Sequence, residues 1–112
     1  MREPMPLKIP KTVKVGHYHL PIKRVKNLRT QDGSGAWGIW YFNKFEIELE
    51  SPIPCKDKER ETLLHEILHA IVTINHLPVE MPREEELVGR MSLALITLLR
   101  DNPKLARYLL DD

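Results

Sequence analysis

The stretch between residues 61 and 72 constrains this chain more than any other, because it places a His-Glu-x-x-His motif in an apolar segment. The motif consists of His65, Glu66 and His69. An α-helix advances about 100° and 1.5 Å per residue, so the two histidines share one face, about 6 Å apart along the axis. Two imidazoles so placed can bind one tetrahedral Zn²⁺, and Glu66 can reach a water molecule on that ion. The motif therefore predicts a helix that carries a metal-dependent hydrolytic site.

A purely structural cluster of polar side chains is the alternative interpretation, because so short a motif also arises by chance. The apolar surroundings argue against it, since they predict a helix that is buried on nearly all sides. Two histidines and a carboxylate would be costly in such a helix without partners, and we therefore favour a metal site. The surrounding apolar residues are Leu63, Leu64, Ile67, Leu68, Ile71, Val72 and Ile74.

Length and composition narrow the class of protein. A chain of 112 residues predicts a single domain with a modest core. The net charge of +1 gives no field that favours nucleic acid or a membrane surface, and no apolar run approaches the ~20 residues of a membrane span. Cys55 is the one cysteine, and the first residues do not resemble a signal peptide. We expect a cytoplasmic protein, monomeric or a small homo-oligomer, that binds neither nucleic acid nor membrane.

Residue patterns outside the motif predict an α+β fold. Alternating apolar residues indicate a small sheet of three to four strands, mostly antiparallel, packed on the helix that carries the motif. In the last strand, Phe45, Ile47 and Leu49 are expected to face the core and three glutamates to face solvent. Pro21 marks the second strand as an edge strand or as bulged. The predicted strands cover residues 12–15, 18–25, 37–42 and 45–50.

Two long helices follow the strands. The first is expected over residues 56–75 and the second over residues 82–100, where a proline begins the helix and glutamates fill its first turn. Residues 1–11 are expected to form an extended, proline-containing arm. Residues 104–112 are expected to form a C-terminal tail that includes a short helix.

A catalytic zinc needs a third protein ligand, and the second helix offers the candidates. His76 shares a face with His69 but would lie about 10 Å further along a continuous helix, too far to share the ion. Glu85 shares a face with small residues that let the helices approach closely, and we favour it. Glu84 and Glu86 stay open as alternatives, and all three glutamates also suit a solvated helix N-terminus.

The chain resembles a known family at these positions. The first-helix motif, followed by Glu85-x-x-Val88-x-x-Met91-Ser92, resembles the gluzincin metallopeptidases, in particular the small minigluzincins and the related ImmA/IrrE-type peptidase domain. The resemblance covers roughly residues 12–103 and is strongest at the motif. It implies a minimal zincin-like fold in which His65, His69 and Glu85 bind zinc and Glu66 is the catalytic base.

The resemblance also implies a peptide or protein substrate, which would pair with the strand over residues 45–50 by β-augmentation. One position departs from the family pattern. Many relatives carry Asn or Asp four residues after the third ligand, where the side chain supports the site, whereas this chain has Gly89. That support must therefore come from another residue, or it is weaker.

In the resulting hypothesis, Glu66 accepts a proton from a zinc-activated water and passes it to the leaving amine. An additional donor to the oxyanion is often needed. His17, His19, Tyr41 and Tyr108 are available for this role, and the sequence does not choose among them.

The alternative function is a catalytically weak or inactive zinc-binding protein, such as a phage-associated regulator or adaptor. In such a latent form, Asp111 or Asp112 of the C-terminal tail, or a second copy of the chain, would fill the open position on zinc. A blocking thiolate from Cys55 is a less favoured version of the same idea.

Overall fold

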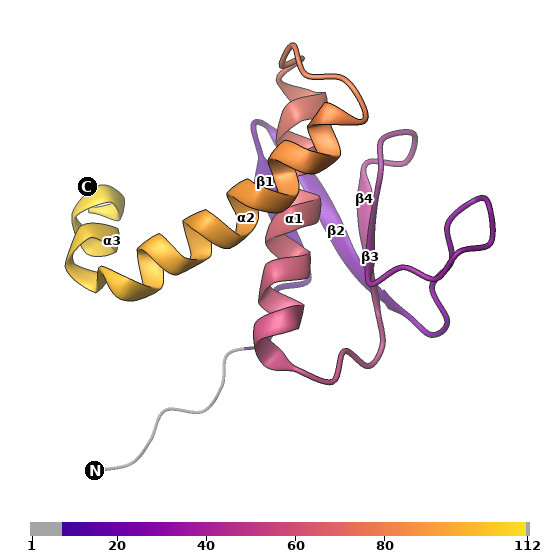
Figure 1. Ribbon diagram of the computed structural model, residues 1–112, viewed down its shortest axis with the longest axis horizontal. Coiled ribbons are helices and arrows are strands. Elements are labelled where there is room, and N and C mark those ends of the chain that lie inside the picture. The colour runs from indigo at the N-terminus through magenta and orange to yellow at the C-terminus, as the bar shows by residue number, and fades with distance from the viewer. Residues whose placement is uncertain (1–7, 112) are drawn as a thin grey trace.

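The computed structural model describes residues 8–111 and consists of a sheet on which one of three helices packs directly (Figure 1). The strands are β1 (Thr12–Val15), β2 (Tyr18–Val25), β3 (Gly38–Tyr41) and β4 (Glu46–Glu50). The helices are α1 (Lys56–Ile74), α2 (Arg83–Asp101) and α3 (Pro103–Leu110). The predicted α+β class is confirmed, and each predicted strand and long helix agrees with the structure to within one residue at either end. Residues 1–7 of the expected arm, and Asp112, lie outside the described residues.

The four strands form one mixed sheet in the order β1-β2-β4-β3. β1 and β2 are antiparallel, as are β3 and β4, whereas β2 and β4 run parallel. β4 is therefore a central strand with a neighbour on each side, and β3 lies at an edge. The expectation that a substrate pairs with the strand over residues 45–50 is thus wrong, because the hydrogen-bonding edges of that strand are already taken by β2 and β3.

β2 changes its partner half-way along its length. Its first half pairs with β1, as far as Thr12 opposite Pro21, and its second half pairs with β4, starting at Ile22 opposite Ile47. Pro21 therefore stands at the changeover, where its missing N–H removes no bond from the ladder with β4. The predicted edge position is wrong for β2 as a whole, since strands lie on both sides of it.

The core lies between the sheet and α1. One buried cluster consists of Ile22, Ile47, Leu49 and Ile53, and half-buried residues of α1 pack against it. A second cluster is formed by Val15, Leu20 and Ala70. The inward positions of Ile47 and Leu49 are confirmed, because both are fully buried.

Glu46 corrects the expectation that all three glutamates of β4 face solvent. Its side chain is buried, and its carboxylate contacts the Lys23 ammonium at 3.3 Å and the Lys44 ammonium at 3.9 Å. These two lysines cover the charge, so burial does not leave it unpaired.

α1 is less enclosed than its apolar sequence predicts. Leu63, Leu64, Ile67 and Leu68 are only half-buried. The sheet covers one face of α1 and α2 covers another, which leaves the remaining surface of the helix open (Figure 1). The buried positions fall on the face that carries the motif; they are Glu59, Thr62, Glu66, His69, Ala70 and Val72.

α2 packs on α1 and runs away from the sheet, and α3 packs on α2 at its far end (Figure 1). Val88 and Ser92 are the buried residues of α2. Among residues 8–111, no helix combines the length and the apolar character that crossing a bilayer requires.

Candidate metal centre

Two helices and one turn place the candidate ligands. His65 and His69 lie one turn apart on the face of α1 that meets α2. α1 ends at Ile74 and is capped by Asn75, and His76 then takes a left-handed conformation (φ +51°) that turns the chain back. The first turn of α2 then contains three consecutive glutamates, and it lies beside the two histidines.

Glu85 bridges the two histidines. Its Oε1 accepts a hydrogen bond from Nε2 of His65 at 2.8 Å, and its Oε2 accepts one from Nε2 of His69 at 2.7 Å. One ligand atom from each of the three residues lies within 4.8 Å of the other two. Both Nε2 atoms therefore converge on one carboxylate that comes from a different helix.

This donor set fits zinc chemically. Two imidazole nitrogens and a carboxylate oxygen form a known catalytic zinc set, which leaves a fourth position for water. Zinc–ligand bonds of about 2.0–2.2 Å place the ligands of one ion roughly 3–4 Å apart, and the ligand atoms of His65, His69 and Glu85 already lie within 4.8 Å of one another.

The other two glutamates have different surroundings. Glu84 contacts the second ring nitrogen of His69, Nδ1, at 2.5 Å through its Oε2. Glu86 points to the exposed side of α2, where it pairs with Arg90 at 3.0 Å. Of the three candidates, Glu85 alone contacts both histidines.

The charge of His69 depends on these acidic neighbours. Burial disfavours the imidazolium, but the hydrogen bond to Glu84 and the charges of Glu66 and Glu85 outweigh it, so the pKa of His69 is raised above its usual value. With an acceptor at each ring nitrogen, the doubly protonated form of His69 can donate to both Glu84 and Glu85. A metal ion bound at Nε2 would have to displace the proton there, and the affinity for such an ion is therefore expected to rise with pH.

Glu66 lies between α1 and β3 and is buried. Burial raises its pKa to about 7, against the opposing effect of the nearby His69 charge. A carboxyl group that titrates near neutral pH is suited to both accepting and donating a proton.

Gly38 allows β3 to approach α1 at this point. A Cβ atom at residue 38 would lie 2.8 Å from Cγ2 of Thr62 and 3.0 Å from Cγ of Glu66. Contacts this short do not occur between well-packed atoms, so the close approach of strand and helix depends on glycine here.

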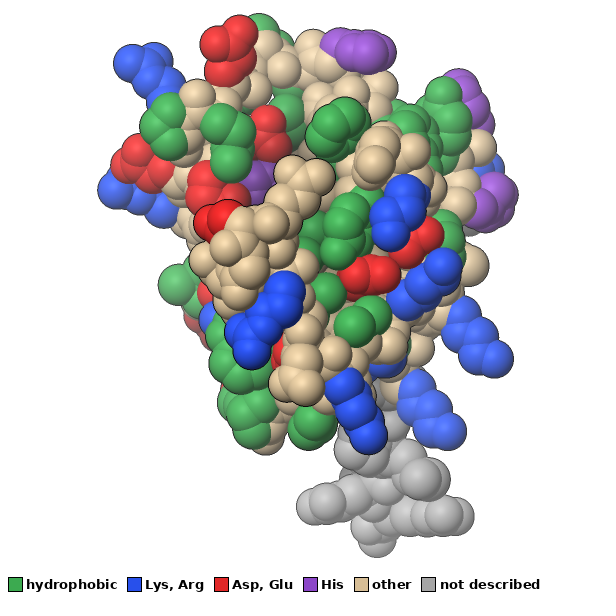
Figure 2. Space-filling view, turned by 90° about the vertical axis from the view of Figure 1, so that its right-hand side faces the viewer, with side chains coloured by type: hydrophobic (Ala, Val, Ile, Leu, Met, Phe, Trp, Pro, Cys, Tyr) green, Lys and Arg blue, Asp and Glu red, His purple; other side chains and the backbone are tan. Residues whose placement is uncertain are grey.

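A hollow of about 210 Å³ opens in front of the motif. The face shown in Figure 2 carries acidic side chains next to a histidine.

Two residues that line this hollow, Lys58 and Glu61, were not predicted from the sequence, although they precede His65 by seven and four residues and thus share its helical face. A second hollow of about 440 Å³ lies beside the first and shares Trp37 with it. The first hollow is lined by Trp37, Gly38, Lys58, Glu61, Thr62, His65, Glu66 and Glu85.

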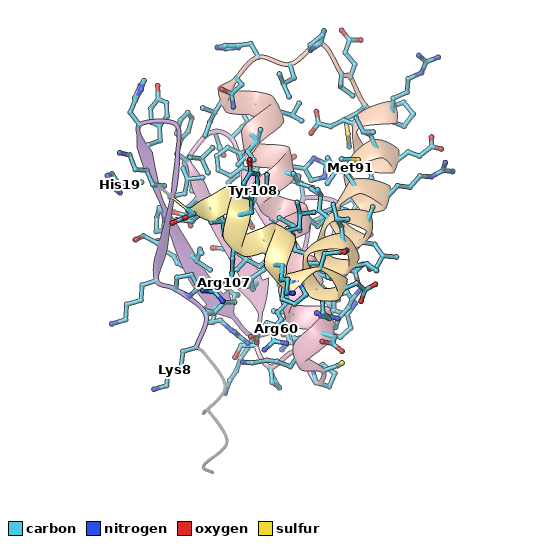
Figure 3. The ribbon with its side chains drawn as sticks, turned by 90° about the vertical axis from the view of Figure 1, so that its left-hand side faces the viewer. Lys8, His19, Arg60, Met91, Arg107 and Tyr108 are labelled. Carbon is cyan, nitrogen blue, oxygen red and sulfur yellow. The ribbon has the colours of Figure 1, made fainter. Side chains whose placement is uncertain are left out.

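The four candidate oxyanion donors lie elsewhere. His17, in the β1–β2 turn, lies against Tyr18 with the ring centroids 4.7 Å apart and the rings tilted by 35°, and the Tyr41 hydroxyl donates to Glu48 at 2.9 Å. His19 lies on β2 and Tyr108 on α3 (Figure 3). None of the four lines the hollow in front of the motif.

The proposed blocking groups also lie apart from the histidines. Glu85 is in the first turn of α2, and the other end of α2 lies roughly 24 Å from it along the helix axis. Asp111 comes after α3, which begins beyond that far end of α2. Cys55 is exposed just before α1, about 15 Å along the axis from His65. Among residues 8–111, neither group reaches the cluster, and Asp112 lies outside the described part of the chain.

Comparison of this chain with protein-family models, with curated proteins and with solved structures finds no match. The assignment of a function therefore rests on the residues and geometry of the site.

Proposed function

We propose that this protein is a zinc-dependent metallopeptidase of the gluzincin type, with His65, His69 and Glu85 as zinc ligands and Glu66 as general base. The observation that carries the proposal is the bridging position of Glu85, whose two oxygens each contact Nε2 of one motif histidine. A chance motif would not require a carboxylate from a second helix to meet both imidazoles. The donor set, the hollow and the buried Glu66 support the same interpretation.

Bound zinc would supply an activated water molecule at neutral pH. Glu66 is next to the first histidine in sequence and lines the same hollow, so its carboxylate can accept a proton from that water. The same carboxyl group then returns the proton to the departing amine. Its pKa of about 7 in the ion-free protein makes both transfers feasible near neutral pH.

β3 is the edge strand beside the hollow and is therefore the candidate for pairing with an extended peptide. It pairs with β4 on one side, and its residue Gly38 lines the hollow together with Trp37. A peptide added at this edge would pass in front of Glu66. We propose peptides or unfolded protein segments as substrates. A cytoplasmic setting suits the free thiol of Cys55.

Metal analysis tests the ligand assignment first. The purified protein is expected to bind about one zinc per chain, and His69→Ala and Glu85→Ala are expected to lose it. Glu86→Ala is the matched control, because Glu86 lies in the same helical turn but pairs with Arg90. A native chain that takes up no zinc even after reconstitution would overturn the proposal.

Hydrolysis of a peptide library tests the catalytic role of Glu66. Glu66→Gln is expected to abolish cleavage and to leave the zinc content unchanged, because the amide keeps the shape of the side chain but cannot accept the proton. Cleavage that survives in this variant would rule out Glu66 as the base.

A second candidate is a zinc-binding regulatory or adaptor protein, and the small volume of the hollow favours it. About 210 Å³ is less than the usual size of a ligand pocket. A native chain that holds zinc and cleaves no peptide of the library would support this candidate over the peptidase.

A further inference from the structure

We infer that Glu84 is a positioning residue for the metal centre, which holds His69 with its proton on Nδ1 and its Nε2 directed at the metal. The inference rests on the proposed zinc site. It assigns a role to a glutamate that the ligand set does not use.

The geometry separates Glu84 from its neighbours. Its Oε2 lies 2.5 Å from Nδ1 of His69, and the two side chains are 17% and 10% exposed. The side chain of Glu85, by comparison, is 52% exposed. The contact between Glu84 and His69 is thus the more enclosed of the two carboxylate contacts to this ring.

The chemistry of imidazole gives this contact its role. A neutral imidazole binds a metal through one nitrogen and carries its proton on the other, and an acceptor for that proton fixes the tautomer and the ring orientation. An ionised carboxylate can only accept, so Glu84 requires the proton to be on Nδ1. Nε2, which already points toward Glu85, is then the nitrogen available to the ion.

The position of Glu84 also bears on Gly89, which stands where many members of the family that this chain resembles carry a supporting Asn or Asp. Gly89 has no side chain to support a ligand, and a Cβ atom there would lie 3.8 Å from Cε1 of His65, not of His69. Support for His69 comes instead from the residue immediately before the proposed third ligand. Within residues 8–111, His65 makes a side-chain hydrogen bond through Nε2 alone, whereas His69 makes one through each ring nitrogen. Only His69 therefore has a partner for the nitrogen that would not bind the metal.

Zinc affinity, measured by competition with a chromophoric chelator, tests this role. Glu84→Ala is expected to weaken zinc binding about 10- to 100-fold, as is usual when such a partner is lost. Glu84→Gln keeps an acceptor oxygen and is expected to recover part of that loss. Glu86→Ala is the matched control and is expected to bind as the native chain does. Equal affinities for Glu84→Ala and Glu86→Ala would overturn the inference.

The imidazole NMR signals of His69 give a readout that a merely structural role would not move. In the zinc-loaded native chain and in Glu84→Gln, the ring is expected to carry its proton on Nδ1 and the metal on Nε2. In Glu84→Ala, that proton is expected to exchange faster with water because its acceptor is gone. An unchanged exchange rate would overturn the inference even if zinc affinity fell.

Two further measurements distinguish misfolding of the variant, failure of the proposed zinc site and failure of the role of Glu84. Thermal unfolding of ion-free Glu84→Ala shows whether the variant folds; if it does not, Glu84→Gln carries the test through its zinc affinity, which is expected to be lower than that of the native chain, and an affinity equal to the native one would overturn the inference. A native chain without zinc affinity defeats the proposed function, whereas a native chain that binds zinc as tightly as Glu84→Ala defeats the role of Glu84 alone.

Discussion

Gly38 and Glu66 show how closely the sheet and the motif helix depend on each other at the scale of single residues. The strand passes so near α1 that a single methyl group at residue 38 would be 2.8 Å from Thr62 and 3.1 Å from Leu49. Glu66 is enclosed by this approach, and its burial raises its pKa to about 7. The property that suits Glu66 to proton transfer therefore depends on the absence of a side chain on the neighbouring strand.

Gly38→Ala is accordingly expected to destabilise the fold by about 1–3 kcal/mol, the usual cost of forcing extra atoms into a packed region. Urea unfolding of the ion-free protein measures this cost. Thr62→Ser removes the nearest methyl group, so the double variant is expected to lose less stability than the two single variants together. Strict additivity of the two changes would contradict the steric explanation.

At the scale of elements, an ion pair joins β2 to the start of α1. Glu59 is buried, and its carboxylate accepts hydrogen bonds from Arg24 at 2.9 Å and from Lys56 at 3.1 Å. Burial alone would raise the pKa of Glu59, but the bonds from Arg24 and Lys56 outweigh it and lower the pKa below its ordinary value of 4.5. The contribution to stability is therefore complete above pH 4.5 and is lost as the pH falls through the lower folded-state pKa.

Glu59→Gln is expected to reduce the free energy of unfolding by about 1–3 kcal/mol at neutral pH, because a charged hydrogen-bond acceptor is lost. The difference between the native chain and the variant should shrink below pH 4.5, where the native carboxylate takes up its proton. Denaturant unfolding at pH 7 and pH 3 measures both values. Glu86→Gln, whose ion pair with Arg90 is exposed, is the control with little expected change. A difference for Glu59→Gln that is the same at both pH values would exclude the ion pair as its source.

At the scale of the whole molecule, the proposed metal would add a link between α1 and α2, which already meet through helix packing and through side-chain contacts such as that of Arg100 with Asp57 at 3.4 Å. A ligand that binds the folded chain alone stabilises it by about 2.7 kcal/mol at a hundredfold excess over Kd. The free energy of unfolding of the native chain is expected to rise with zinc concentration to this extent. His69→Ala should show no such rise, and an equal rise in that variant would place zinc at another site.

The sequence predicts the elements of this fold well and their neighbours less well. Alternation and helix signals are local, so the bounds of β4 and α1 follow from the residues within them. The central place of β4 does not, because it depends on parallel pairing with β2, a strand far away in sequence. The burial of Glu46 has no local signal for the same reason, since Lys23, one of the two lysines that cover its charge, lies on β2 and 23 residues away in sequence.

The candidate metal site was likewise predictable within one helix but not between the two helices. The spacing of His65, Glu66 and His69 is a property of one helix, and the sequence shows it directly. The choice among three consecutive glutamates depends on how α2 is rotated against α1, which no local pattern specifies. Glu85, the favoured candidate, contacts both histidines, while the contact between Glu84 and His69 has no sequence signal beyond the helix N-terminal position of Glu84.

α2 is held to the rest of the protein by few buried side chains, namely Val88 and Ser92, whereas α1 is buried at six positions. Such a helix opens locally at a lower free energy than the helix beneath it, and its amide hydrogens exchange sooner. Because Glu84 and Glu85 share the first turn of α2, one opening event removes both carboxylates from His69. The residence time of an ion held between the two helices would then be set by the opening rate of α2, while the sheet stays folded.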